Sequence, residues 1–196
     1  MLGTQIKPVT VAKDLGVYIG YLIFNEDITK TASDCMFKVT RVNRIKHLLD
    51  KKKTLIYLIN AFVFSKLFYR SMVWSSTSKK NVRKLQLVQN YAYRIVAGLR
   101  KYDHVSEAQK SLKWLNVRDK LLFNDLVIVY KSLKNLTPGY LHGRFQYRAK
   151  TNQRDTRQNN DLTLPRYRLA TGQKTFTYRG AKLYNSIAKD MRHGKS

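Results

Sequence analysis

Positive charge constrains this chain more than any other feature of its sequence. Lysine and arginine number 38 against 12 aspartates and glutamates, which gives a formal net charge of +26 over 196 residues. Ordinary domains of this size carry a net charge of roughly 2 to 8, so the excess repels itself unless a polyanion neutralises it. Any fold must hold these cations at its surface, and a phosphate-rich partner is the first expectation. The alternative is a surface made basic for solubility alone.

The rest of the composition allows a packed core. Hydrophobic residues make up 43% of the chain and aromatic residues 12%, which is enough apolar material for a folded domain. The single cysteine, Cys35, excludes an internal disulfide and a cysteine-based zinc site. The most apolar stretch, Leu55–Tyr69, contains Asn60 and Lys66 and is shorter than the roughly 20 residues of a membrane span. It predicts a core helix, and we expect neither a signal peptide nor a membrane partner.

Apolar residues at three- and four-residue steps predict a mainly α-helical bundle. A short β element of one or two strands is expected before it, over residues 1–29, where β-branched residues alternate with glycine. A helical domain then covers residues 30–143, followed by a basic linker at 144–160 and a C-terminal basic segment at 161–196.

Individual elements follow from the same patterns. Helices are predicted over Thr54–Tyr69 and Leu121–Leu133, a short helix after a capping box at Ser106 and Gln109, and a last helix over Ala181–Ile187. Short strands are predicted in the tail at Leu162–Pro165 and Thr175–Tyr178. A further helix is expected to bury Leu85, Val88, Ala92, Ile95, Val96 and Leu99 and to expose Arg83, Gln86, Asn90 and Arg94.

The sequence offers no catalytic or metal-binding constellation. Metal-dependent phosphoryl transfer needs carboxylates that converge on two cations, and here Glu26 and Asp27 are the only adjacent acidic pair. We expect that pair to open a helix, where negative charge meets the helix dipole. The histidines share no metal-ligand spacing, and no glycine-rich phosphate loop is present. The chain is therefore expected to use no cofactor and not to be an enzyme by itself.

Clustered cations are the best candidates for a binding site, because counterion release from phosphates needs density of charge more than geometric precision. Aromatic residues lie between those of the tail and are able to stack on unpaired bases or to pack internally. The candidates form three clusters, namely Lys51, Lys52 and Lys53; Lys79, Lys80, Arg83 and Lys84, with Arg94 farther along the same helix; and Arg166, Arg168, Lys174, Arg179 and Lys182.

Several stretches, in order along the chain, resemble the reverse transcriptases of non-LTR, jockey-like retrotransposons. Lys13–Ile19 is similar to the family's "K-x-L-G-V-x-I" strand, and Asn60–Tyr69 to its "N-A-L-V-x-S-x-L-x-Y" helix. Val73–Ile95 resembles "V-W-x-(…)-K-L-Q-x-x-Q-N-x-A-x-R-I". Tyr130–Leu133, Pro138–Leu141 and Phe176–Ser186 also fit, so the likeness covers nearly the whole chain. Departures include Asp27 where the family usually has histidine and Gly20 where it often has aspartate.

The resemblance implies that this chain corresponds to the end of the palm, the thumb and the following segment of an RNA-directed DNA polymerase. Its palm aspartates would lie upstream of Met1, and Leu15 and Gly16 would belong to a primer-grip-like element. The expected partners are RNA, DNA or an RNA–DNA hybrid, and the fingers and palm of a reverse transcriptase. A truncated element copy, in the nucleus or in a cytoplasmic ribonucleoprotein, is the implied origin. The alternatives are a self-associating or protein-binding helical module and an enzyme assembled in trans.

Overall fold

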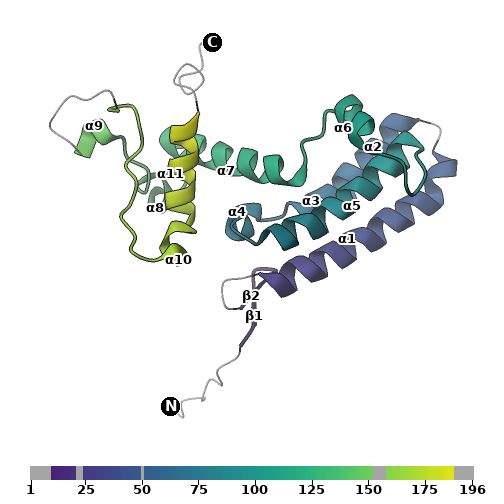
Figure 1. Ribbon diagram of the computed structural model, residues 1–196, viewed down its shortest axis with the longest axis horizontal. Helices are drawn as coiled ribbons and strands as arrows, with labels where there is room; N and C mark the ends of the chain where they lie inside the picture. Colours follow the sequence, from purple (N-terminus) through teal and green to yellow (C-terminus); the bar gives the residue numbers. More distant parts are fainter. Residues whose placement is uncertain (1–9, 21–23, 50, 152–157, 188–196) are drawn as a thin grey trace. The chain divides into compact units, whose positions relative to one another are not determined.

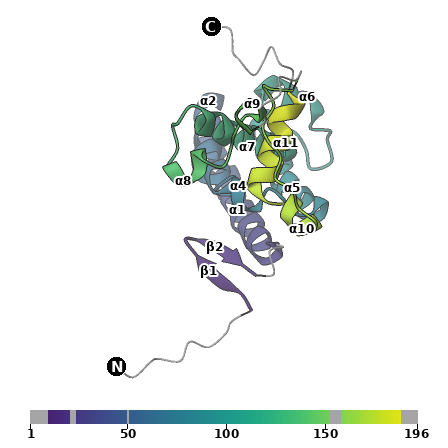
Figure 2. The ribbon, with the colours of Figure 1, turned by 90° about the vertical axis from the view of Figure 1, so that its left-hand side faces the viewer.

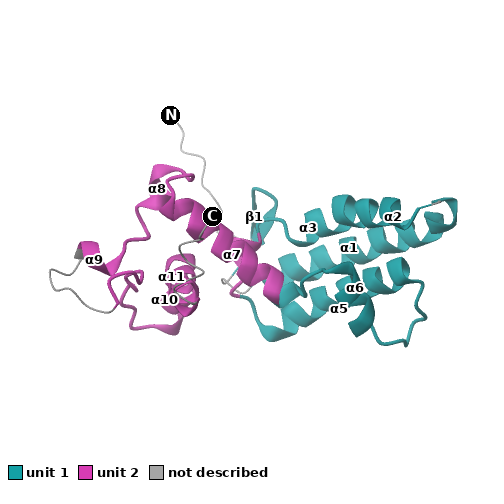
Figure 3. Ribbon diagram, turned by 90° about the horizontal axis from the view of Figure 1, so that it is seen from above, with its two compact units in different colours: residues 1–70, 77–118 teal, residues 71–76, 119–196 magenta. Residues whose placement is uncertain are grey.

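The computed structural model describes residues 10–20, 24–49, 51–151 and 158–187 (Figure 1). It is mainly helical with a two-stranded antiparallel sheet near the N-terminus, which confirms the predicted fold class. The chain divides into two compact units (Figure 3), which are residues 1–70 with 77–118 (unit 1) and residues 71–76 with 119–196 (unit 2). This division runs through the segment 30–143 that the sequence suggested as one domain. Within the described residues, no helix is long and apolar enough to cross a membrane.

Unit 1 opens with a β-hairpin. Strands β1 (Ala12–Asp14) and β2 (Val17–Ile19) pair antiparallel, with Ala12 opposite Ile19, and lie side by side in Figure 2. The two residues between them, Leu15 and Gly16, have φ values of 45° and 86°, and two positive φ angles are what a tight type I′ hairpin turn requires. The short β element before the helices is thus confirmed, but the turn at Leu15 and Gly16 divides the stretch Lys13–Ile19 that resembles one continuous strand of the family motif.

The hairpin is tied to the first helix, α1 (Asn25–Ile45). The backbone N–H of Tyr18 donates to the buried Asp27 carboxylate at 2.9 Å. Glu26 and Asp27 stand in the first turn of α1, as predicted from the helix dipole. A Cβ on Gly20 would lie 2.9 Å from Cγ2 of Val11, so the close approach of the hairpin ends leaves no room for a longer side chain at this position.

The core of unit 1 is a helical bundle. Helix α1 passes into the 3₁₀ helix η1 (Lys46–Leu48), and a second helical path runs through α2 (Lys52–Ile59), the π-helix η2 (Asn60–Phe64) and α3 (Ser65–Leu67). This path contains most of the core helix predicted over Thr54–Tyr69, but it begins and ends two residues earlier. Both paths lie beside α5 (Lys79–Ala97) in Figure 1. The completely buried residues include Cys35, Val39, Ile59, Val63, Leu67, Leu85 and Ala92.

The π-helix η2 explains how the one cysteine is accommodated. A π turn shifts backbone hydrogen bonds by one residue and disturbs the regular ladder. The Cys35 thiol of α1 donates to the Val63 carbonyl of η2 at 3.7 Å, deep in the core. Burial raises the pKa of Cys35 to about 11, although Lys38 and Lys66 pull it the other way. Cys35 is therefore a neutral packing residue.

Helix α5 buries Leu85, Val88, Ala92, Ile95 and Val96 as predicted, with Leu99 half-buried beyond its end. The expectation that Gln86 and Asn90 face water was wrong. Gln86 accepts the N–H of Val117 at 2.9 Å and donates to Gln89 and Asn90, and Gln89 donates to the Leu115 carbonyl at 2.9 Å. These amides hold the chain that follows α6 (Ser106–Leu112) against α5. The capping box at Ser106 was also wrong, because Val105 is the N-cap of α6.

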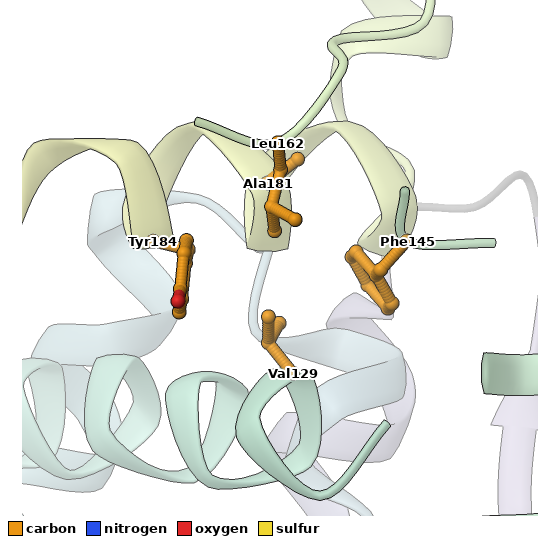
Figure 4. Close-up of a cluster of buried hydrophobic side chains, with 5 residues drawn as sticks. All are labelled: Val129, Phe145, Leu162, Ala181 and Tyr184. Atoms are coloured by element: carbon orange, nitrogen blue, oxygen red, sulfur yellow. The ribbon is translucent and has the colours of Figure 1, made fainter. Parts of the chain in front are cut away.

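Unit 2 contains most of α7 (Val117–Leu133) together with α4 (Ser71–Trp74), α8 (Gly139–His142), α9 (Arg148–Thr151), α10 (Ala170–Gln173) and α11 (Phe176–Ser186). Figure 4 shows its buried cluster, in which Ala181 and Tyr184 of α11 face Val129 of α7, with Phe145 and Leu162 beside them. A Cβ on Gly180 would lie 2.7 Å from Cγ2 of Val129. Glycine thus allows α11 to approach α7 closely.

The tail was predicted less well than the bundle. Thr175 is the N-cap of α11 and Phe176–Tyr178 form its first turn, so the strand predicted at Thr175–Tyr178 is a helix start, and the last helix begins five residues before Ala181. The segment at Leu162 forms one isolated antiparallel bridge with Tyr147. Phe176 packs edge-on against Phe145, with ring centroids 5.7 Å apart, and this tertiary contact outweighs the β propensity of its neighbours.

Candidate nucleic-acid interface

The start of α5 carries a group of exposed cations. Ser78 caps the helix by accepting the Asn81 N–H at 3.3 Å, and Lys79, Lys80 and Arg83 follow on its first two turns. All three side chains are exposed, and none of them makes an ion pair with a described residue. No acidic residue stands in the first turn of α5. We call Lys79, Lys80 and Arg83 the α5 cluster.

Lys84, which the sequence grouped with the α5 cluster, has a different surrounding. It is half-buried, and its Nζ donates to Thr29 Oγ1 of α1 at 2.7 Å. Next to it, Asn81 donates to the Asn25 side chain at 2.6 Å. These bonds bring the first turns of α1 and α5 together. Glu26, in the first turn of α1, makes no ion pair with a described residue.

A second cluster, Lys51, Lys52 and Lys53, begins α2. Lys51 is the N-cap and its carbonyl accepts the N–H groups of Thr54 and Leu55. All three lysine side chains are exposed. The first turn of α2 contains no acidic residue, and Asp50, which precedes the cluster in the sequence, lies outside the described residues. We call these three lysines the α2 cluster.

Both clusters lie at the electrostatically unfavourable end of a helix. The N-terminus carries about half a positive charge, and a cation there costs roughly 0.3–1 kcal/mol where a carboxylate would stabilise. The same ends present backbone N–H groups without intrahelical partners, an arrangement that binds phosphate oxygens. A bound polyanion would relieve the repulsion in both clusters. Their placement therefore favours anion binding over a purely structural role.

Arg94 was predicted to be exposed on α5, but it is half-buried. One guanidinium nitrogen donates to the Asp103 carbonyl at 3.2 Å, and its Nε is buried without a partner among the described residues. The Asp103 carboxylate in turn accepts the N–H of Arg100 at 2.7 Å. Arg94 thus holds the loop that follows α5, a role that periodicity alone does not reveal.

The tail candidates lie in unit 2 and differ among themselves. Arg166, Arg168, Lys174 and Lys182 are exposed. Arg179 is instead the centre of a polar cluster: one guanidinium nitrogen contacts Asp125 at 3.2 Å, Ser75 Oγ at 2.7 Å and the Met72 carbonyl at 3.2 Å.

Asp125, the partner of Arg179, is buried, and the loss of solvation disfavours its charged form. Burial raises the pKa of Asp125, and the nearby Arg179 charge and the Ser75 hydroxyl offset part of the rise. The side chain of Asp125 is 4% exposed and that of Arg179 22%. Arg179 therefore anchors α11 to α7 and α4 within unit 2, and the nucleic-acid contact predicted for it stays a prediction.

The aromatic candidates of the tail and the apolar candidate at the hairpin turn differ in how far they are exposed to solvent. Tyr167 and Tyr178 pack edge to face, with ring centroids 6.1 Å apart. Leu15, at the hairpin turn, is 72% exposed, and its neighbour Gly16 lies near the Tyr69 ring. The primer-grip-like residues thus form a projecting turn rather than part of a strand.

The candidate list omitted a basic face on α1. Arg41 and Arg44 are exposed one turn apart, and the Arg41 guanidinium lies 4.3 Å from the ring centroid of the exposed Phe37. Lys30 lies 3.7 Å from the centroid of the Tyr18 ring on the hairpin. The spacing of Phe37, Arg41 and Arg44 by four and three residues is the signal that could have identified this face.

No three His, Cys, Asp or Glu side chains gather as metal ligands within the part of the chain that the structure describes. Comparisons with family models, with curated proteins and with solved structures find no match for this chain. The resemblance to non-LTR reverse transcriptases accordingly stays a prediction that rests on the motifs themselves.

Proposed function

We propose that this chain binds the phosphate backbone of RNA, DNA or an RNA–DNA hybrid with little sequence preference. The α5 cluster is the observation that carries the proposal: three exposed cations occupy the positive end of a long helix without an ion-pair partner among the described residues. The α2 cluster repeats the arrangement in the same unit. Such cations gain affinity by releasing condensed counterions from a polyanion.

The likeness of the sequence to a reverse-transcriptase thumb supports the same proposal and makes it more specific. In that reading, unit 1 grips the template–primer duplex by its backbone, and the Leu15–Gly16 turn approaches the end of the primer. In the same reading, polymerisation would require the fingers and palm of an RNA-directed DNA polymerase, which the likeness does not cover. The chain would then act as a nucleic-acid-binding part rather than as an enzyme.

The test compares two variants with equal loss of charge. The first replaces the α5 cluster (Lys79→Gln, Lys80→Gln, Arg83→Gln). The second replaces three exposed lysines of unit 1 that are not clustered in this way (Lys101→Gln, Lys110→Gln, Lys113→Gln). Binding to a labelled RNA–DNA hybrid is measured by fluorescence anisotropy over a series of salt concentrations.

Each phosphate contact contributes roughly 0.9 to the slope of log K against log salt on duplex DNA. Loss of the α5 cluster should therefore lower the slope by roughly two to three units, and the control variant by less than one. Equal effects of both variants would show diffuse attraction without a localised site, and unchanged slopes in both would contradict the proposal.

A second candidate function is association with a protein or with another copy of the chain. Unit 1 exposes large apolar side chains on several helices, with exposed fractions of 58% for Phe37, 71% for Tyr57 and 53% for Phe62. Exposed apolar groups that gather into a patch favour an interaction surface. Size-exclusion chromatography over a range of concentrations tests this function, because a monomer at all concentrations contradicts self-association.

A further inference from the structure

Unit 2 contains a hollow of about 550 Å³ that opens between α7, α10 and α11. Leu122 contributes from α7, Gln173 and Lys174 from the end of α10, and Tyr178 and Lys182 with their neighbours from α11. The volume falls within the range that holds small-molecule ligands, roughly 300–1,000 Å³. None of its lining residues belongs to the two lysine clusters of unit 1.

The lining combines an apolar surface with positive charge. Leu122, Leu183 and the Tyr178 ring supply apolar contact, and no acidic residue is among the residues that line the hollow. Lys174 and Lys182 are exposed, and their ammonium groups make no ion pair with a described residue. A ligand that matches this lining has a flat apolar body and an anionic group.

Gln173 adds a means of recognition. Its side chain is exposed at the hollow and makes no hydrogen bond with a described residue. A primary amide offers two donors and one acceptor oxygen, which is the set that pairs with the polar edge of a nucleobase. Aromatic rings such as that of Tyr178 provide stacking or edge contacts for the base itself.

The walls of the hollow, of which Arg179 is itself a part, are held in place by contacts within unit 2. Arg179 ties α11 to Asp125 of α7 and to Ser75, and one of its guanidinium nitrogens donates to the Lys174 carbonyl at 3.0 Å. Gly180 allows α11 to pack closely on Val129. A site whose walls are fixed before binding loses less entropy when a ligand arrives.

We propose that this hollow seats one unpaired nucleotide. The base lies against Tyr178 and the two leucines, Gln173 bonds its polar edge, and Lys174 and Lys182 bind its phosphate. The choice of a nucleotide among amphipathic anions rests on the nucleic-acid binding proposed above. A free mononucleotide and an unpaired nucleotide within a strand share this chemistry, and the experiment separates the two sources.

The experiment uses the full chain and two labelled single strands of equal length and charge. One is oligothymidylate, and in the other a tetrahydrofuran spacer replaces every base. The variant Ala170→Glu places a carboxylate among the lining residues, in the first turn of α10. Ala149→Glu is the matched control, since Ala149 is an exposed alanine in the first turn of α9 and does not line the hollow.

Wild-type chain should bind oligothymidylate about ten-fold more tightly than the abasic strand, because base contacts add to phosphate contacts. Ala170→Glu should abolish this preference and Ala149→Glu should keep it. Saturation-transfer NMR of thymidine monophosphate tests the free nucleotide directly. If the two strands bind equally well but thymidine monophosphate gives a signal that Ala170→Glu removes, the result also supports the site and assigns it to free nucleotides.

Two results would overturn the inference. The first is equal affinity for the two strands together with no signal from thymidine monophosphate. The second is a base preference or a nucleotide signal that persists in Ala170→Glu. Failure of both strands to bind at low salt would contradict the phosphate binding proposed above, and the NMR experiment would still decide whether the hollow takes a nucleotide.

Discussion

At the residue scale, the contact between Gly180 and Val129 sets how closely two helices of unit 2 approach. Alanine at position 180 would gain up to about 1 kcal/mol of helix propensity, but its Cβ would lie 2.7 Å from Val129 Cγ2 and 3.3 Å from the Phe145 ring. Overpacking of a core costs roughly 1–3 kcal/mol. Val129 is completely buried, so little relaxation is available, and the clash outweighs the gain in propensity.

We expect Gly180→Ala to lower the free energy of unfolding by about 1 kcal/mol, measured by urea denaturation followed by circular dichroism. Gly139→Ala is the control, because a Cβ there meets nothing within 4 Å and the φ of Gly139 is not in the left-handed region. It should leave stability within about 0.5 kcal/mol of wild type. If Gly180→Ala were as stable as wild type, α11 and α7 would be less closely packed than described.

Asp125 gives unit 2 a dependence on pH. Burial raises the pKa of its carboxyl group despite Arg179 and Ser75. The folded chain therefore holds this proton more tightly than the unfolded chain, and stability is lost as pH rises through the raised pKa. Asn at position 125 keeps an acceptor oxygen without the charge. We expect Asp125→Asn to gain stability relative to wild type as pH is raised from acid to neutral, measured by urea denaturation at a series of pH values.

Asp125→Ala is the comparison for that experiment. It removes the acceptor and leaves Ser75 and Arg179 without this partner, so it should cost roughly 1–3 kcal/mol at neutral pH. If Asp125→Asn instead lost stability relative to wild type as pH rose, the ion pair with Arg179 would outweigh the cost of burial. That result would reverse the direction of the pKa shift.

At the element scale, α5 and α6 differ in how a serine is placed at the helix start. Ser78 is the N-cap of α5 and accepts the N–H of Asn81, whereas Ser106 is the first residue of α6 and caps nothing. Loss of an N-cap oxygen costs about 1 kcal/mol. Ser78→Ala should therefore destabilise the chain by about 1 kcal/mol in thermal unfolding, and Ser106→Ala should have little effect. Equal effects would contradict the cap assignment.

Periodicity predicted the helices well and their polar faces poorly. The apolar positions of α5 and the path from Lys52 to Leu67 follow from spacing alone, because burial repeats with the helical turn. Gln86 and Asn90 occupy the opposite side of α5, yet they bond internally through the amide network with Val117. A sequence pattern cannot tell a polar group that faces water from one that faces another backbone segment.

The candidate site was predicted only in part, because a sequence pattern does not show which cations bond to other parts of the chain. The exposed lysines of the α2 and α5 clusters could be found because their charges are adjacent in sequence. Arg94 and Arg179 also lie in basic stretches of the sequence, but their side chains bond to Asp103 and Asp125, nine and 54 residues away. The hollow of unit 2 depends on three helices meeting, so no local pattern indicated it.

At the scale of the whole molecule, charge and core are distributed over two units. Each unit has its own buried residues, and each carries exposed cations on helices or beside them. The core of unit 2 contains residues from Val129 to Tyr184. Its packing therefore joins the predicted helical domain at 30–143, the linker at 144–160 and the C-terminal segment at 161–196. A net charge of +26 repels itself, so binding of a polyanion would lower the electrostatic free energy of the chain.

The most direct test of nucleic-acid binding is the salt dependence of wild-type affinity for a labelled RNA–DNA hybrid, measured by fluorescence anisotropy. Contacts by both lysine clusters predict saturable binding and a log–log slope of several units, since each phosphate contact contributes roughly 0.9 on duplex DNA. No saturable binding at low salt, or an affinity independent of salt, would contradict the account and leave the apolar surfaces of unit 1 as the basis of its function.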